Sequence, residues 1–449
     1  MSSTTSLNRL AVNGTIWTVI GYGLSQTIRF GGNLVLTRLL APELFGLMAL
    51  ANVFVIGLQL FSDVGIVPSI IQNKHGDETQ FLNTAWTIQV IRGVVLWLGC
   101  CLIAYPVSLF YEDARILWLL PILGLSSVFN GFNSTAIASI KRRVDLARNA
   151  GFEISVQIIS LSVLIIWAYF SPTIYALAGS HAVGALIRTA MSYAIIPGYK
   201  NWFAWNKDAL RELLSFGRWI FLSTAMTFLA SQTDRLMLGK LISIEMLGIY
   251  TVAATLADIP RQVIGMLGSN VIFPIVSRSA TAPRHELRAK ILKKRWLLLM
   301  AALVMLTIMV CFGDIVIRFL YDSRYGQAAW MFPVIALSLW HTVLYSSMNP
   351  CLMGIGRPIY GAIGSAIKFI VLITGLPVSY QMFGVAGVIV TISYSDLPAY
   401  LVTTYGLQRE KIGNFSQDVK ATGIFLSLLI ASLFIRFSLG LGTPLDGLM

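Results

Sequence analysis

The sequence predicts an all-α integral membrane protein of 12–14 transmembrane helices, arranged as two parallel six-helix bundles. Three observations support this: an apolar composition, long apolar runs that recur along the chain, and a segment that occurs twice. Of the 449 residues, 56% are hydrophobic and only 12% are charged, whereas soluble chains carry about 25% charged residues. A run of about 20 apolar residues crosses a hydrocarbon core of about 30 Å as a helix, so we expect many membrane crossings.

Thirteen helices are expected from these runs, joined by connections too short to hold a soluble domain. The first run contains Arg29 and is longer than the core of a signal peptide, so we interpret it as a retained first helix. The odd number leaves open a misplaced boundary or a missing last helix. The expected helices cover residues 11–40, 43–71, 83–109, 115–140, 149–170, 173–196, 214–241, 245–276, 295–320, 327–353, 358–380, 383–407 and 420–440.

The duplicated segment covers residues 36–46 and returns 202 positions later at residues 238–248. In both copies a cation is followed by a short turn, a glutamate and a glycine. In the first copy the cation is Arg38 and the glutamate is Glu43. This match favours internal duplication over chance similarity between two apolar hairpins. Six helices precede the second copy, so both copies enter the membrane from the same side. The halves are therefore expected to be parallel repeats, related by a pseudo-two-fold axis along the membrane normal.

The expected organisation is an N-terminal six-helix bundle at residues 1–206, a C-terminal six-helix bundle at 207–407, and an additional helix and tail at 408–449. Lys and Arg gather in alternate connections, above all in residues 141–148 and 284–295, which places the N-terminus in the cytoplasm. This asymmetry explains the net charge of +13 as a topology signal. A nucleic-acid partner is not expected, because the sequence has no basic groove pattern with interleaved aromatic residues.

Polar residues of the first expected helix recur at helical spacing. Tyr22, Gln26, Arg29 and Asn33 follow one another in steps of three or four, which keeps them on one face. We expect this face to line a central cavity and to contact the substrate. Arg29 lies near mid-depth, where an unpaired cation is costly, and its guanidinium suits bidentate binding of a phosphate group. The alternative is that Arg29 pairs with a carboxylate for packing alone.

Three carboxylates occupy mid-membrane positions of the expected helices: Asp63, Asp234 and Asp258. Asp63 is interpreted as a partner of Arg29, a proton carrier or a cation ligand, or alternatively as a helix-end acid bonded to the backbone. Asp234 is a second possible partner of Arg29. Asp234 and Asp258 lie on polar faces, and we expect all three carboxylates to act in ion coupling or gating. Arg261, beside the polar stripe of Asp258, is a candidate to contact the substrate.

Two further charges lie deep in the second half. Lys368 and Asp396 are expected to form an ion pair that serves either structure or gating, and Lys368 is also a candidate to contact the substrate. Lys368 shares a face with Gly361 and Gly364, which would allow another helix to approach closely. Four other charges are expected near helix ends, where they can reach the membrane interface, and receive no role. They are Arg92, Glu153, Arg188 and Asp314.

Signals of catalysis are absent from the sequence. It contains no GxxxxGK[ST] phosphate loop, no HExxH motif and no GxSxG motif. The four cysteines lie in apolar runs without a CxxC pair, so neither a disulfide nor a zinc site is expected. We therefore expect a protein that is not an enzyme, with no catalytic residue, metal or cofactor.

Several segments resemble the Wzx-type polysaccharide flippases, whose superfamily also holds the multidrug MATE exporters and the lipid II flippase. The resemblance is carried by residues 38–46, 61–66 and 232–239 and by the basic residues 141–143, and it covers residues 1–407. It implies a MATE-like, V-shaped pair of six-helix bundles. The implied substrate is an oligosaccharide linked to undecaprenyl pyrophosphate.

The resemblance implies a flippase that moves this lipid-linked oligosaccharide from the cytoplasmic to the outer leaflet for surface polysaccharide synthesis. Because the sequence has no nucleotide-binding loop, we expect alternating access of the two halves to be coupled to an ion or a proton. Its expected location is the bacterial inner membrane, with membrane lipids as neighbours and polysaccharide polymerase and export machinery as partners. One alternative is a MATE-like exporter of small organic molecules, although Arg29 and Lys368 would give such a cavity the wrong sign for organic cations. Another is a membrane-embedded component of polysaccharide assembly.

Overall fold

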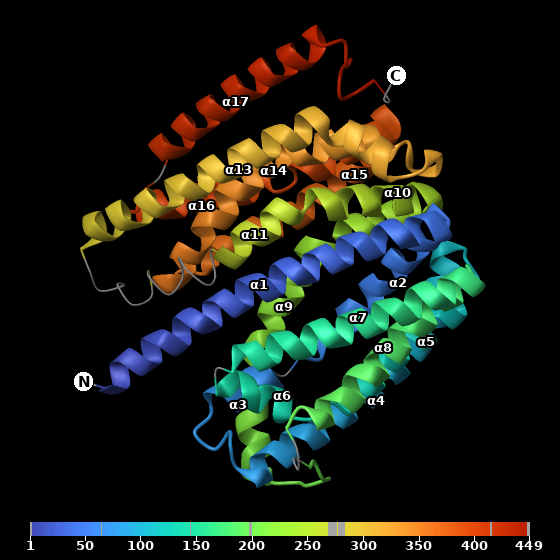
Figure 1. The fold of residues 1–449 in the computed structure, drawn as a ribbon, viewed down its shortest axis with the longest axis vertical. Helices are drawn as coiled ribbons and strands as arrows, with labels where there is room; N and C mark the ends of the chain where they lie inside the picture. Colours follow the sequence, from blue (N-terminus) through green and yellow to red (C-terminus); the bar gives the residue numbers. More distant parts are fainter. Residues whose placement is uncertain are drawn as a thin grey trace. The chain divides into compact units, whose positions relative to one another are not determined.

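The computed structural model describes residues 2–63, 65–143, 145–196, 200–267, 276, 283–413 and 415–446. Every regular element in these ranges is a helix (Figure 1). Seven of these helices are long and apolar enough to cross a membrane, and up to eight if the bent pair α5–α6 counts as one span. The all-helical membrane class predicted from the sequence is confirmed, while the larger number of crossings stays a prediction.

The chain divides into two compact units, Met1–Phe228 and Leu229–Met449. Unit 1 is organised around α5, which contacts α2, α4 and α8, while α1 packs on α7. The crossing of α4 and α5 is close because Gly93 and Gly131 meet there: a Cβ added to Gly93 would lie 3.2 Å from the Cα of Gly131. Unit 1 contains α1 (Ser2–Leu39), α2 (Pro42–Phe61), α3 (Ile66–Gln72), α4 (Thr79–Tyr111), α5 (Ile116–Gly131), α6 (Ala136–Arg142), α7 (Leu146–Phe170), α8 (Ile174–Ala194) and most of α9 (Lys207–Leu241).

Unit 2 is organised around α14, which contacts α10, α11, α13, α15 and α16. α15 is kinked at Gly384, whose φ of 59° is a left-handed value, so the two helices expected at 358–380 and 383–407 meet there. A Cβ at Gly364 would lie 2.9 Å from the Cα of Ala399, so a second helix does approach the small-residue face of α15. Unit 2 contains α10 (Ile244–Ala257), α11 (Ile259–Leu267), α13 (Arg284–Leu320), η2 (Ser323–Tyr325), α14 (Ala328–Gly354), α15 (Ile359–Tyr394), α16 (Leu397–Arg409) and α17 (Phe415–Ser438).

Four of the helices expected to be continuous are broken, and this corrects the sequence-based boundaries. The helix expected at 43–71 breaks between α2 and α3, and the one at 115–140 bends by 63° between α5 and α6. The helix expected at 245–276 breaks at Asp258, and its residues 268–275 lie outside the described ranges. A fourth break separates α15 from α16 beside Asp396. Polar residues occupy each break because the freed backbone groups need hydrogen-bond partners inside a membrane.

Helix α17 is fixed against α13, and the two run side by side in Figure 1. At one end Arg295 of α13 binds Asp418 of α17, and at the other Arg436 of α17 binds Asp314 of α13. All four side chains are buried. Asp314 is therefore a buried partner and not the helix-end charge that the sequence indicated. The two reciprocal pairs set the register of α17 on α13.

The same local structure follows a long helix in each unit. In unit 1 the backbone N–H of Arg115 donates to Asp113 over 2.9 Å, and in unit 2 that of Arg324 donates to Asp322 over 3.0 Å. Each arginine also turns its guanidinium back onto the same aspartate. In unit 1, Arg115 further binds Glu43 of the duplicated segment over 2.6 Å. This shared turn is an additional likeness between the two halves of the chain.

Candidate functional site

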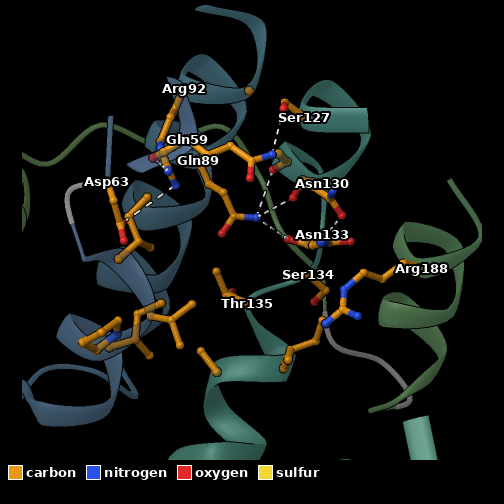
Figure 2. Close-up of a pocket in the computed structure, with 18 of the residues that line it drawn as sticks. Gln59, Asp63, Gln89, Arg92, Ser127, Asn130, Asn133, Ser134, Thr135 and Arg188 are labelled. Atoms are coloured by element: carbon orange, nitrogen blue, oxygen red, sulfur yellow. Dashed lines mark hydrogen bonds and ion pairs between the residues drawn. The ribbon is translucent and has the colours of Figure 1, made fainter. Parts of the chain in front are cut away.

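A polar cavity of about 410 Å³ lies inside unit 1, among helices that are otherwise apolar (Figure 2). This volume falls within the range of small-molecule binding sites, about 300–1,000 Å³. Residues from six helices and from the α5–α6 connection line the cavity. Its polar lining residues are Gln59, Asp63, Gln89, Arg92, Ser127, Asn130, Asn133, Ser134, Thr135, Lys141 and Arg188.

One wall of the cavity is the break between α5 and α6. The side-chain amide of Gln89, on α4, donates to the carbonyl oxygens of Asn130, Gly131 and Asn133 over 3.0, 3.1 and 3.2 Å. Figure 2 shows Gln89 reaching across the cavity toward this segment. Tyr193 donates to a fourth carbonyl of the break, that of Phe132, over 2.8 Å. These donors satisfy backbone carbonyls of the unwound segment, as a break between membrane-spanning helices requires.

A second wall is the end of α2. Arg92 donates to the hydroxyl of Ser62 over 3.0 Å and to the carbonyl of Gln59 over 2.7 Å. Asp63 accepts from the backbone N–H of Gly65 over 2.9 Å and lies 3.9 Å from the Arg92 guanidinium. Asp63 is therefore a helix-end acid bonded to the backbone, as the second of the two sequence-based interpretations expects. Its cation partner is Arg92 and not Arg29. Arg92 lines the cavity, which corrects the expectation that it reaches the membrane interface.

The third wall carries a bidentate ion pair. Arg188 of α8 binds both carboxylate oxygens of Glu153 on α7, over 2.7 and 2.8 Å. Its guanidinium also lies 5.3 Å from the ring centre of Phe152. Both charged side chains are partly buried. The sequence assigned neither residue a role, because it cannot show that two separate helices bring them together.

The predicted stripe on α1 is also in unit 1. Gln26 donates to the Tyr22 hydroxyl over 3.1 Å, as their spacing on one face predicts. Arg29 is exposed, and it makes no hydrogen bond or ion pair with another described residue. Asn33 is partly buried one turn further along. Within unit 1, Arg29 is thus not paired with Asp63 and remains open to an anionic ligand.

Unit 2 contains the remaining predicted residues as separate ion pairs. Lys368 of α15 binds Asp396 over 2.7 Å, which confirms the predicted pair, and Thr342 of α14 donates to the other Asp396 oxygen over 3.3 Å. Arg261 of α11 binds Asp258 over 2.9 Å, in the break before α11. Each of the two candidate substrate-binding cations therefore already has a carboxylate partner within unit 2.

Asp234, on α9, has a different environment. One carboxylate oxygen accepts from the Tyr250 hydroxyl over 3.0 Å. The other, Oδ1, is buried and has no hydrogen-bond partner among the described residues. A buried carboxylate oxygen without a donor is costly. Asp234 is therefore the predicted coupling carboxylate with an open coordination position.

Comparison with known proteins identifies several relatives. The family described as "polysaccharide biosynthesis protein" matches residues 35–330. The succinoglycan biosynthesis transport protein ExoT of Rhizobium meliloti is 21% identical over 76% of this chain and 68% of its own length. The lipopolysaccharide biosynthesis protein WzxC of Escherichia coli is 22% identical over 61% of this chain, and the match spans only 56% of WzxC itself.

Two solved structures show the fold. The lipid II flippase MurJ, in an inward closed conformation, superposes with a TM-score of 0.69 over 97% of this chain and 95% of its own, at 14% identity. An inward-facing MATE multidrug transporter superposes with a TM-score of 0.67 over 90% of this chain and 99% of its own, at 12% identity. The MATE-like fold expected from the sequence is confirmed, while the two symmetric six-helix bundles stay a prediction.

Proposed function

Because the chain belongs to the polysaccharide biosynthesis protein family, we propose that it moves a lipid-linked oligosaccharide across a bacterial membrane. It is a multi-pass membrane protein of the transporter class and not an enzyme, as its relatives indicate. The observation that supports this substrate best is the polar cavity of unit 1. Its lining of amides, hydroxyls and cations stands among helices of unit 1 that expose many large apolar side chains.

The chemistry of the substrate explains why such a lining is needed. Sugar hydroxyls and a pyrophosphate lose their water on entering a membrane, and each unmet polar group costs several kcal/mol, roughly 2–7. Side-chain amides and hydroxyls replace that water for the sugar. An arginine fork replaces it for a phosphate, with charge-assisted hydrogen bonds. The lipid tail needs no such replacement and can stay in the bilayer.

In this proposal the stripe on α1 contacts the pyrophosphate. Arg29 is exposed and without a described partner, which leaves its donors available. Tyr22, Gln26 and Asn33 on the same face contact the adjoining sugar. Arg261 and Lys368 act on the substrate only if they exchange their carboxylate partners for it.

Transport is proposed to proceed by alternating access of the two bundles, coupled to an ion or proton. Asp234 is the carboxylate best suited to bind that ion, because its Oδ1 has no described partner. Asp63, Asp258 and Asp396 are bonded within their own units and are proposed to act in gating. We further propose an inner-membrane location with a cytoplasmic N-terminus, and polysaccharide polymerase and export proteins as partners.

Reconstitution tests the proposal directly. Purified protein is placed in liposomes that carry a polyprenyl-pyrophosphate-linked oligosaccharide in both leaflets, and an impermeant sugar oxidase reports the outward-facing fraction. Flipping makes all of the oligosaccharide reactive, while empty liposomes expose only about half. Arg29→Ala should slow flipping at unchanged protein content, and Arg38→Ala, at the end of the same helix, is the matched control. Equal rates in liposomes with and without protein would refute the proposal, and indifference to imposed ion gradients would refute coupling alone.

A further inference from the structure

The charge balance of the unit 1 cavity is uneven. Three cations line it, and two of them face a carboxylate: Arg92 lies beside Asp63, and Arg188 binds Glu153. The third is Lys141, at the end of α6. Its ammonium group makes no ion pair or hydrogen bond with another described residue. The cavity therefore carries one positive charge that is not in direct contact with a carboxylate of the described residues.

The neighbour of Lys141 shows the contrast. Arg142 is bound at two of its three nitrogens: its Nη1 donates to the carbonyl oxygens of Ile70, Ile71 and Asn73 over 2.8, 2.9 and 2.6 Å. Its Nε binds Asp77 over 2.9 Å. Arg142 thus caps the C-terminal end of α3, while the partly buried Lys141 is one of the residues that line the cavity. Glu153 is near enough to feel the Lys141 charge, but both of its oxygens are bound by Arg188.

Neutral hydrogen-bonding groups surround this charge. The side-chain carbonyls of Gln59 and Gln89 accept no hydrogen bond from a described residue, and the Nδ2 of Asn130 donates none. Among the described residues, the polar side-chain atoms that are buried without a hydrogen-bond partner do not include these three. Each of the three is therefore accessible to a ligand in the cavity. They offer both acceptors and donors, as sugar hydroxyls require.

We propose that this cavity binds an acidic sugar, with the ammonium group of Lys141 on the acid and Gln59, Gln89 and Asn130 on the ring hydroxyls. The acid is a carboxylate or a phosphate, both of which a lysine binds as a point charge. The cavity volume of about 410 Å³ suits one sugar unit and not a whole repeat unit. This inference rests on the proposed function and adds a subsite, separate from the α1 stripe, that selects substrates by charge.

The test measures ligand-dependent thermal stabilisation of the full-length protein in detergent, because a ligand that binds only the folded state raises its melting temperature. The probes are D-glucuronate, glucose 1-phosphate and neutral glucose, all at one ionic strength. At least one acidic probe should stabilise the protein at a concentration about tenfold below that needed for glucose. The stronger of the two identifies carboxylate or phosphate as the acid.

Matched variants locate the effect. Lys141→Gln should raise the required concentration of the acidic probe about tenfold, and Lys141→Arg should retain binding. Arg143→Gln removes an exposed charge two positions away and should behave as the unchanged protein. If Lys141→Gln does not fold, Asn130→Asp serves instead, because its new carboxylate should weaken acidic probes more than glucose.

Three results would overturn the proposal: no stabilisation by either acid, equal stabilisation by glucose, or an equal loss in Lys141→Gln and Arg143→Gln. None of them bears on flipping itself. A protein that flips lipid-linked oligosaccharide in liposomes but shows one of these results keeps the proposed function and loses this subsite. A protein that binds the acidic probe but does not flip the lipid keeps this subsite and loses the proposed function.

Discussion

Replacing Asp418 with Ala removes one partner of a buried ion pair between α13 and α17. In the intact protein Arg295 lies 2.5 Å from Asp418, and the two side chains are 0% and 1% exposed. Arg295 also donates to the Ser347 hydroxyl over 2.9 Å, and Asp418 accepts from Tyr400 over 3.1 Å. The substitution would leave the guanidinium buried without its counter-charge.

The expected loss of unfolding free energy is large because the charge left on Arg295 cannot reach water. Removing one partner of a buried pair costs about 3–5 kcal/mol, most of it from the charge left behind. The pair between Arg357 and Glu410 provides a control in the same unit, since its side chains are 60% and 18% exposed. Because Arg357 is largely exposed, Glu410→Ala leaves no buried charge behind, and such a surface pair contributes about 0–1 kcal/mol. Asp418→Ala should therefore lower the free energy of unfolding at least threefold more than Glu410→Ala.

Chemical denaturation of the protein in lipid nanodiscs measures both changes. A third variant, Arg295→Met with Asp418→Leu, removes both charges and should recover most of the stability, because apolar residues of similar volume replace a buried pair at little cost. The reasoning fails if Asp418→Ala and Glu410→Ala differ by less than about 1 kcal/mol. It also fails if the double variant is as unstable as the single one.

Three further results are expected. Gln89→Leu leaves the carbonyls of the α5–α6 break without their donor and should cost about 1–3 kcal/mol of unfolding free energy; no change in denaturation midpoint would contradict this. Lys368→Ala and Asp396→Ala should together lose more stability, summed, than the double variant loses, as a coupled pair requires; additive losses would refute the coupling. Partial burial raises the pKa of Asp113, but the hydrogen bonds from Arg115 outweigh it and lower that pKa. A carboxyl whose pKa is lowered in the folded state stabilises the protein above the unfolded pKa near 4, and this stabilisation is lost as the pH falls through the folded pKa. The difference in unfolding midpoint between the unchanged protein and Arg115→Gln should therefore shrink from pH 7 to pH 3. A difference that stays constant with pH would contradict this prediction.

The membrane class and one ion pair could be predicted because they depend on local patterns. Recurring apolar runs identify helices without any tertiary information. Lys368 and Asp396 were the charges deepest in adjacent expected helices, so each was the natural partner of the other. The structure confirms their contact and the close approach of a helix at Gly364.

The breaks could not be predicted from hydropathy, because their stability depends on distant donors. Gln89 lies more than 40 residues before the carbonyls that it binds, and Arg92 lies 30 residues after Ser62. A signal was present, since Asn130 begins a run of turn-forming residues inside the apolar stretch at 115–140. The cavity cannot be predicted for the same reason: sequence position indicates only that Arg92 and Arg188 lie near helix ends, whereas their partners decide where they point.

The most direct test of the flippase proposal is to measure the amount and the leaflet of the lipid-linked oligosaccharide in a strain deleted for this gene. Complete repeat units on polyprenyl pyrophosphate should accumulate in the cytoplasmic leaflet, and re-expression of the unchanged protein should clear them. A strain that shows no accumulation and still exports assembled polymer would contradict the proposed function.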